Sequence, residues 1–351
     1  MENNNIFFEI LSGSTEFALF NLAENSTDHL IAFNYYKEYA ERFWNTHTQN
    51  VKFYFPLDFS YKQNFTINGS VQLYDERAII RINEGVLLKL YKTFYSILSI
   101  DNLIDTLSET DDGSLHIKNI YTFNDTFPEY EYTFLLPINK ERKIIAEIMA
   151  MFAIKFVILH EIAHHFDGHV LYMKTYFNDE TLNIVRKANE ERILDKQTLE
   201  MDADAFAISQ LIDEMIDFIN NDTLYSNHIK NPSNFCFILF ISIHILFLIL
   251  NDEYELKNST YSPELVRSLT VLDAAKVNLS YKASEIISKT EILDIIKTSI
   301  IKANSLYNSV YGKIDFSSLV NYDESHLKSL HENWKKMRVV LSPYAIAQLA
   351  Y

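Results

Sequence analysis

The stretch that decides the fold is KERKIIAEIMAMFAIKFVILHEIAHHF, Lys140 to Phe166, because it predicts one long and largely apolar helix. Asn139 just before it is a suitable N-cap, and Gly168 just after it is a suitable stop signal. A helix that is apolar around most of its surface belongs in the core of a protein. Polar side chains on this helix are therefore expected to start from a buried surface.

Composition bounds the class of protein. The chain has 351 residues, of which 48% are hydrophobic and 22% are charged, as in a folded globular protein. Gly (6) and Pro (6) are scarce, which favours a helix-rich fold over a β-sandwich or a Gly-rich phosphate-binding fold. The formal net charge of −16, without a basic patch, excludes nucleic acid as an expected partner.

Two features indicate a cytoplasmic protein. The single cysteine, Cys236, excludes an internal disulfide and a zinc site made of several cysteines. Residues 1–17 lack the basic region and the cleavage site of a signal peptide.

Residues 235–250 are the one stretch apolar enough to suggest a membrane span. They are 16 residues long, whereas a spanning helix needs roughly 20 apolar residues. We therefore prefer a buried core helix, and a membrane anchor stays open as the alternative.

The remaining pattern predicts an α+β fold that is mainly helical. Up to residue 139 we expect mixed helices and strands at 28–44, 51–59, 65–74, 78–85 and 86–99, and one more hairpin within 101–139. Asn68-Gly69 suits a tight hairpin turn within 65–74. From residue 140 we expect further helices at 180–195, 198–220, 233–250, 263–279, 284–310 and 323–341. Residues 1–139 should form a small mixed sheet packed on the long helix, and residues 140–351 a helical part of the same unit.

The long helix carries an HExxH motif, formed by His160, Glu161 and His164. Side chains four residues apart lie one above the other on a helix face, so both imidazoles can bind one metal ion. We expect the histidines to hold Zn²⁺, the metal to lower the pKa of a water, and Glu161 to accept its proton. The alternative is a chance match on a core helix, since the chain has 11 His.

A catalytic zinc site usually has a third protein ligand. The metzincin pattern would place a Gly and a His where this chain has Asp167 and Val170, so that pattern fails. His169 is one position away from the expected histidine and lies beyond the predicted end of the helix, so we expect it beside the metal ligands, as a partner of one of them, and not among them.

A better candidate for the third ligand lies in LEMDADAFAISQLID, residues 199–213. Glu200 and Asp204 are four residues apart on one helix face, where they either repel mildly in solvent or bind beside a cation. Ala203 and Ala207 would let this helix pack closely against the HExxH helix. We expect Glu200 to bind zinc and Asp204 to accept the other ring N–H of a zinc-binding histidine.

Together, the two motifs resemble those of the gluzincin metallopeptidases. E-x-x-A-D-A-F-A, residues 200–207, is similar to the HtpX-like and CAAX-prenyl-protease family. H-E-x-x-H-x-x-x-G-H, residues 160–169, resembles small soluble relatives that include the Lit-like phage-exclusion peptidases. The resemblance covers roughly residues 140–270 and implies a zincin-like fold, bound zinc and hydrolysis of peptide bonds. The membrane-embedded relatives have long spans that this chain lacks, which favours the soluble type.

A further resemblance concerns STYSPELVR, residues 259–267, where HtpX-like proteases often carry S-T-H-P-P-x-x-x-R. Pro263 and Arg267 agree with that pattern, whereas Tyr261 replaces the His and Ser262 the first Pro. The same residues also suit the start of a helix, with Ser262 as N-cap. If the resemblance holds, Arg267 has a structural role and the role of Tyr261 stays open.

The sequence leaves the group that stabilises the oxyanion unsettled. The candidates are Tyr261, His244, Tyr172 and His169. His244 lies in an apolar helix, where it is also explained as a hydrogen-bonded core residue.

Two predicted elements could line the substrate cleft. The strand at 78–85 is either an edge strand that pairs with an extended peptide or an ordinary inner strand. The polar helix at 180–195 either covers the cleft or is simply a solvated helix.

These features predict a soluble, zinc-dependent metallopeptidase acting on a protein or peptide, with no nucleic acid or membrane partner and with its oligomeric state open. One alternative is a protease of defence or regulation that cleaves a single cellular protein when triggered. Another is a non-catalytic binding protein stabilised by zinc. Glu161 argues against the latter, because a structural zinc site needs no general base.

Overall fold

The computed structural model describes residues 28–49, 55–74, 77–100, 116–124, 127–177, 190–220, 231–254, 264–312, 324–346 and 349. Its helices are α2 (Asp28–Thr48), α3 (Glu84–Ile100), α4 (Lys140–Phe166), α5 (His169–Phe177), α6 (Glu190–Asn220), α7 (Pro232–Tyr254), α8 (Glu264–Lys282), α9 (Lys289–Tyr311) and α11 (Glu324–Leu341). Its strands are β1 (Leu57–Lys62), β2 (Gly69–Tyr74), β3 (Arg77–Asn83), β4 (His116–Asn124) and β5 (Phe127–Leu136). The fold is mainly helical with a small mixed sheet, which confirms the predicted fold class.

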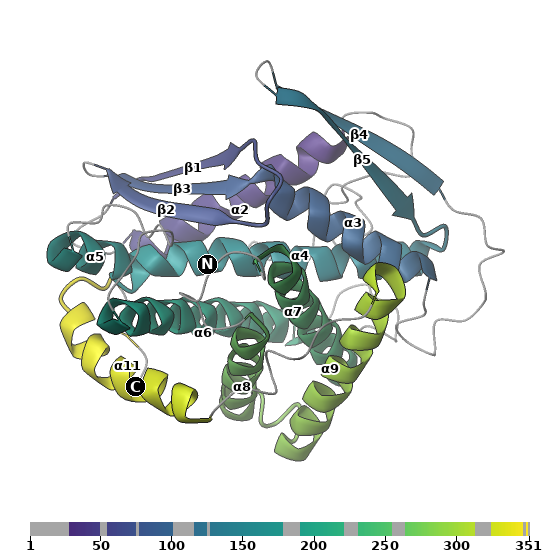
Figure 1. The fold of residues 1–351 in the computed structure, drawn as a ribbon. Coiled ribbons are helices and arrows are strands. Elements are labelled where there is room, and N and C mark those ends of the chain that lie inside the picture. The colour runs from purple at the N-terminus through teal and green to yellow at the C-terminus, as the bar shows by residue number, and fades with distance from the viewer. Residues whose placement is uncertain are drawn as a thin grey trace.

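Helix α4 is the central element of the fold. Its N-cap is Asn139, whose side chain accepts hydrogen bonds from the backbone N–H groups of Glu141 and Arg142. Every residue from Ile148 to Phe166 is buried. The three-stranded sheet lies on one side of α4 and α6 lies on the other (Figure 1). Polar side chains of α4 can therefore meet both neighbours away from solvent.

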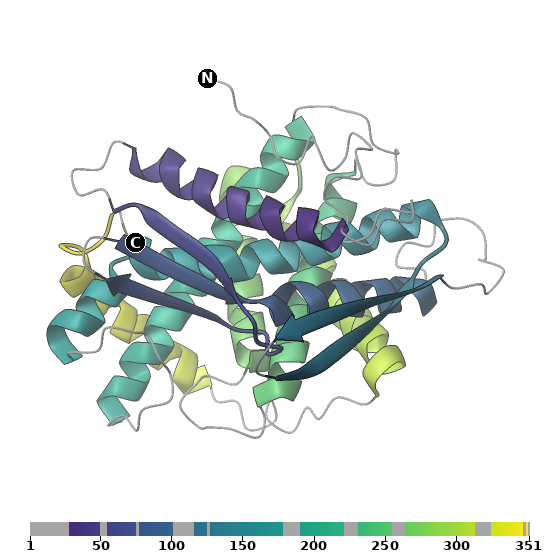
Figure 2. The same cartoon turned by 90° about the horizontal axis from the view of Figure 1, so that it is seen from above.

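The three-stranded sheet has the order β1-β3-β2, with β3 parallel to β1 and antiparallel to β2. Seen from above, it lies over α4 with α2 alongside (Figure 2). The strand expected at 78–85 is β3, and it is the central strand, so it cannot serve as an edge. The edge strand beside the HExxH helix is β2.

The predicted hairpin turn at Asn68-Gly69 is wrong. Gly69 opens β2 and pairs with Ile82 of β3, and the hairpin instead joins Tyr74 to Arg77 at the other end of these strands. Of the strand predicted at 51–59, residues 51–54 lie outside the described residues, and β1 runs from Leu57 to Lys62. Local turn chemistry favoured Asn-Gly, but the glycine is needed for a close tertiary contact.

The helical predictions are confirmed for most of the chain, as is the second hairpin, formed by β4 and β5. Helix α5, which starts at His169, was not predicted, and α6 runs without a break through residues 195–198, where two helices were expected to meet. Most of the helix predicted at 180–195 lies outside the described residues. Its proposed role as a cover over the cleft therefore stays a prediction.

Helix α7 contains the apolar segment 235–250. The stretch Pro232–Asn251 is long and apolar enough to cross a membrane, yet 78% of it is buried inside the protein. It packs against α4, α8 and α9, which is the placement expected of a core helix.

The hydrophobic core crosses the boundary predicted at residue 139. Buried residues from Ala32 to Tyr307 form one cluster that includes residues on both sides of it. The division into two parts stays a prediction.

The end of α4 is covered by the segment that follows α11. The backbone N–H of Ile346 donates to the carbonyl oxygen of Phe166 at 2.6 Å. Gly168 has a φ of 77°, and a Cβ there would lie 2.7 Å from the backbone carbon of Tyr344. A glycine is thus required both by the backbone conformation and by the contact.

Gly168→Ala is expected to lower the free energy of unfolding by about 1–3 kcal/mol from backbone strain, with a further loss from the contact with Tyr344. Gly312→Ala shows the cost of strain without crowding, because its φ of 94° is also positive but no atom lies within 4 Å of the added Cβ. Urea unfolding of both variants measures the difference. A loss in Gly168→Ala that stays within about 1–3 kcal/mol would show that the crowding at Tyr344 adds nothing to the backbone strain.

Candidate metal centre

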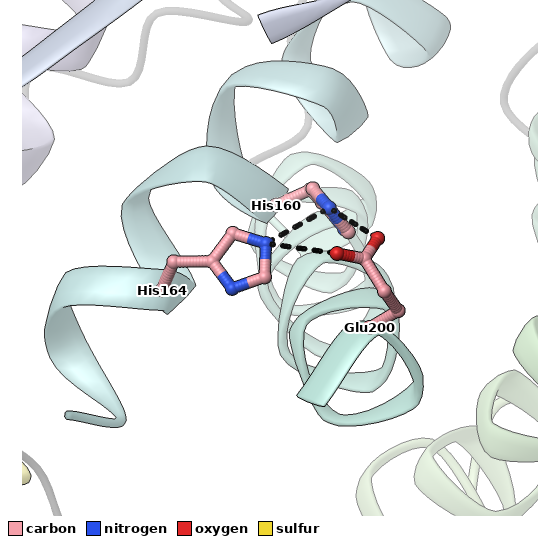
Figure 3. A group of neighbouring side chains, drawn as sticks. All are labelled: His160, His164 and Glu200. Carbon is pink, nitrogen blue, oxygen red and sulfur yellow. Dashed lines mark hydrogen bonds and ion pairs between the residues drawn. The ribbon is translucent and has the colours of Figure 1, made fainter. Parts of the chain in front are cut away.

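Three buried donors converge where α4 faces α6: His160, His164 and Glu200 (Figure 3). The Nε2 atoms of the two histidines are 3.2 Å apart. Oε2 of Glu200 lies 3.3 Å from His160 Nε2, and its Oε1 lies 3.7 Å from His164 Nε2. Zinc bonds of about 2.0–2.1 Å in tetrahedral geometry place ligand atoms about 3.3–3.4 Å apart. The three donors therefore fit a zinc ion.

The two helices that carry these donors pack closely. His160 and His164 are one turn apart on α4, and Glu200 comes from α6. Ala203 and Ala207 of α6 are fully buried, and such small side chains let two helices approach closely. The structure thus brings together the three residues that the sequence predicted as metal ligands.

Asp204 lies behind His160. Its Oδ1 is 2.9 Å from His160 Nδ1, the ring nitrogen that faces away from the donor group. Arg267 of α8 holds the same carboxylate through two hydrogen bonds of 2.9 Å, from Nε to Oδ2 and from Nη2 to Oδ1. Arg267 Nη2 also lies 3.4 Å from Glu200 Oε2. One guanidinium therefore positions two carboxylates of α6.

The electrostatics of this group favour a bound cation. Burial lowers the pKa of His160, but the hydrogen bonds and negative charges of Asp204 and Glu200 outweigh it and raise the pKa to about 10. Burial raises the pKa of Glu200, yet His160 and Arg267 bring it well below its usual range. These carboxylates stay ionised inside the protein and attract positive charge.

Glu161 points toward β2 beside the donor group. Burial raises the pKa of its carboxyl group to about 7, with the charge of His160 opposing this rise. Gly69 of β2 packs directly on it, since a Cβ at Gly69 would lie 2.4 Å from Glu161 Oε1. A carboxylate with a pKa near neutrality is suited to accept and return a proton.

His169 lies on the other side of His164 and is fully buried. Its Nδ1 is 2.9 Å from His164 Nδ1, and its Nε2 is 3.1 Å from Asp202 Oδ2. Asp202 also shares a side-chain hydrogen bond with Asp167. His169 is therefore a neighbour of a candidate ligand and does not join the group formed by His160, His164 and Glu200.

The remaining candidates lie apart from the donor group or outside the described residues. Both ring nitrogens of His244 have partners, Ser268 Oγ at 2.7 Å and Asn304 Oδ1 at 3.0 Å, which favours the core interpretation. The hydroxyl group of Tyr172 donates to Asp195 at 3.1 Å. Tyr261 lies outside the described residues.

Sequence reasoning missed three features of this site. Arg267 was expected to be structural, but the motif gave no sign that it contacts Asp204 and Glu200. Asp202 was not singled out, although it lies between the two predicted acidic residues in the sequence. Gly69 was explained by a turn. Only the acidic spacing of 200, 202 and 204 could have drawn attention to Asp202 in advance.

Arg267→Met is expected to lower the free energy of unfolding by about 1–3 kcal/mol, because it removes two hydrogen bonds from the buried Asp204 carboxylate and leaves His160 as its remaining partner. Lys282→Met is the control, since it removes an ion pair with Asp213. The side chain of Lys282 is 28% exposed and that of Asp213 is 46% exposed. That exposed pair should contribute about 1 kcal/mol or less. Urea unfolding measures both, and similar small losses would contradict the role given to Arg267.

Comparison with known families found one matching family model. A family model described as Peptidase U49 matches residues 120–280, the segment that holds His160, Glu161, His164, Glu200 and Arg267. Curated proteins and solved structures gave no match to this chain. The family match covers less than half of the chain and supports a peptidase.

Proposed function

We propose that this chain is a cytoplasmic, zinc-dependent metallopeptidase in which His160, His164 and Glu200 hold the metal. The proposal rests on the convergence of these donors at 3.2–3.7 Å within a segment that matches a peptidase family. When bound, zinc supplies a Lewis acid that activates a water molecule and polarises the carbonyl group of the substrate.

Glu161 is the proposed general base. It accepts the proton of the attacking water and then delivers it to the amine that leaves. Its burial supports this role, because burial favours the protonated form of the carboxyl group and so helps it take up a proton. Gly69 supports it as well, since the missing side chain leaves room for the Glu161 carboxylate beside β2.

Asp204 and Arg267 keep the ligand His160 in one orientation. Asp204 accepts the Nδ1–H of His160, so the lone pair of Nε2 points to the donor group. Arg267 in turn fixes both oxygens of the Asp204 carboxylate. Outer partners of this kind typically change metal affinity by about 10–100-fold.

The edge of β2 supports a peptide as substrate. Among the described strands β2 pairs only with β3, so its other edge offers backbone N–H and C=O groups. An extended peptide can add to such an edge through main-chain hydrogen bonds. Because Gly69 of β2 touches Glu161, a peptide on this edge would pass close to the general base.

The metal content of the purified protein, measured by mass spectrometry, tests the proposal. We expect one zinc ion per wild-type chain, because three protein donors form one site. Glu200→Ala should lose the metal, whereas Glu161→Gln should keep it and lose hydrolysis of peptides. Asp213→Asn, on the same helix as Glu200, is a matched control for loss of a carboxylate.

Each contrary outcome has a separate meaning. A wild-type protein that takes up no zinc would mean that HExxH is a chance pattern here. Zinc bound without any hydrolysis, of generic peptides or of cellular proteins, would favour the non-catalytic alternative. Loss of zinc in Glu161→Gln would show that Glu161 is a ligand and not the base.

Gly69→Ala is expected to lower the rate of hydrolysis by about 100-fold while zinc stays bound, because the added Cβ displaces the Glu161 carboxylate. Ser70→Ala is the control, since neighbouring residues of a strand face opposite sides of the sheet. Peptidase assays and zinc content of both variants provide the comparison. Unchanged hydrolysis in Gly69→Ala would remove Glu161 from the role of base.

A further inference from the structure

A second group of buried metal-binding residues lies directly beside the first. Asp167, His169 and Asp202 each offer a ligand atom, and these atoms lie within 4.8 Å of one another. Taken alone, this group could hold a second cation. Its contact with His164 decides whether the group binds a cation of its own or instead supports His164.

The contacts form a continuous chain of hydrogen bonds. His164 Nδ1 lies 2.9 Å from His169 Nδ1, and His169 Nε2 lies 3.1 Å from Asp202 Oδ2. Asp167 is hydrogen-bonded to Asp202 at the far end. The exposed fractions of these four residues are between 0% and 8%, so water does not replace these contacts.

The direction of this chain follows from the chemistry of imidazole. A neutral ring has one N–H donor and one nitrogen with a lone pair. His164 Nε2 faces the donor group, 3.2 Å from His160 Nε2, so a metal bound there uses its lone pair and leaves the hydrogen on Nδ1. That hydrogen is donated to His169 Nδ1, which must then carry the lone pair. The hydrogen of His169 is therefore on Nε2, where it is donated to Asp202.

We propose that His169 and Asp202 are positioning residues that together fix the orientation of the metal ligand His164. This inference rests on the proposed function for the metal site at His160, His164 and Glu200. It also excludes a second cation at Asp167, His169 and Asp202 while that metal is bound, because His169 Nε2 then has no lone pair to offer. Asp167 lies at the end of the chain, where its carboxyl group carries a proton and donates it in a hydrogen bond to the Asp202 carboxylate.

The local fold explains how His169 returns to His164 only five residues after it. Helix α4 ends at Phe166, and the positive φ of Gly168 turns the backbone so that α5 can start at His169. Asp167 and His169 thereby flank the turn on the side that faces α6. Each of the two zinc-binding histidines then has its own carboxylate on α6, Asp204 for His160 directly and Asp202 for His164 through His169.

The affinity for zinc, measured by competition with a chelator on the full chain, tests the proposal. We expect His169→Ala and Asp202→Asn each to weaken zinc binding by about 10–100-fold. Because Asp202 acts through His169, the double variant should bind zinc no more weakly than His169→Ala alone. Asp213→Asn, also on α6, should leave the affinity unchanged.

A second measurement needs no variant. Nitrogen-15 NMR of histidine-labelled, zinc-loaded protein distinguishes a protonated ring nitrogen from one with a lone pair. We expect His164 to be protonated at Nδ1 and His169 at Nε2. Circular dichroism and thermal unfolding of the variants, recorded without zinc, confirm that a weaker affinity does not arise from misfolding.

The outcomes separate this inference from the proposed function. Full affinity in both single variants, or His169 protonated at Nδ1 in the zinc-loaded chain, would overturn the inference and leave the metallopeptidase standing. Two zinc ions per chain, one lost in Asp202→Asn and kept in Glu200→Ala, would overturn it as well. A wild-type chain without zinc would remove the proposed function and the inference together.

Discussion

The contact between α4 and α6 places several ionisable groups in the interior, and the rest of the site depends on how their charges are balanced. Burying a charge without a partner costs several kcal/mol, so each acidic side chain of α6 must meet a donor. Glu200 and Asp204 meet His160 and Arg267, and Asp202 meets His169. Helix α8 and the turn at Gly168 bring the partners Arg267 and His169 to these side chains.

The same requirement explains why so much of the site comes from distant parts of the chain. Arg267 is 63 residues from Asp204, and Asp202 is 33 residues from His169. These contacts join α4, α5, α6 and α8, and removing one partner would leave the remaining buried groups with fewer hydrogen bonds. A site of this kind is rigid because its polar groups have few alternative partners.

Much of the fold could be predicted where a pattern lies within one element. The long helix, its cap at Asn139 and the apolar α7 all follow from local periodicity and capping. HExxH and the pair formed by Glu200 and Asp204 could be predicted for the same reason, because each spacing is contained in one helix. Their convergence was an inference from chemistry, since no spacing connects α4 to α6.

Features set by tertiary contacts could not be predicted in this way. Asn68-Gly69 has the composition of a tight turn, but Gly69 is a glycine because Glu161 leaves no room for a side chain. Helix α5 starts directly after Gly168, where a stop signal ends one helix without showing that another follows. The partners of Arg267 depend on how α8 packs, which the motif around it does not encode.

The cover over the end of α4 has a consequence for the newly made protein. Phe166 and Ile346, which are hydrogen-bonded in the folded chain, are about 180 residues apart in the sequence. At typical synthesis rates, roughly ten to forty seconds separate their emergence from the ribosome. During that interval the HExxH helix exists without the segment that covers Gly168 and the turn to His169. A nascent chain would thus carry the residues proposed as metal ligands well before it carries the segment that covers the turn beside them.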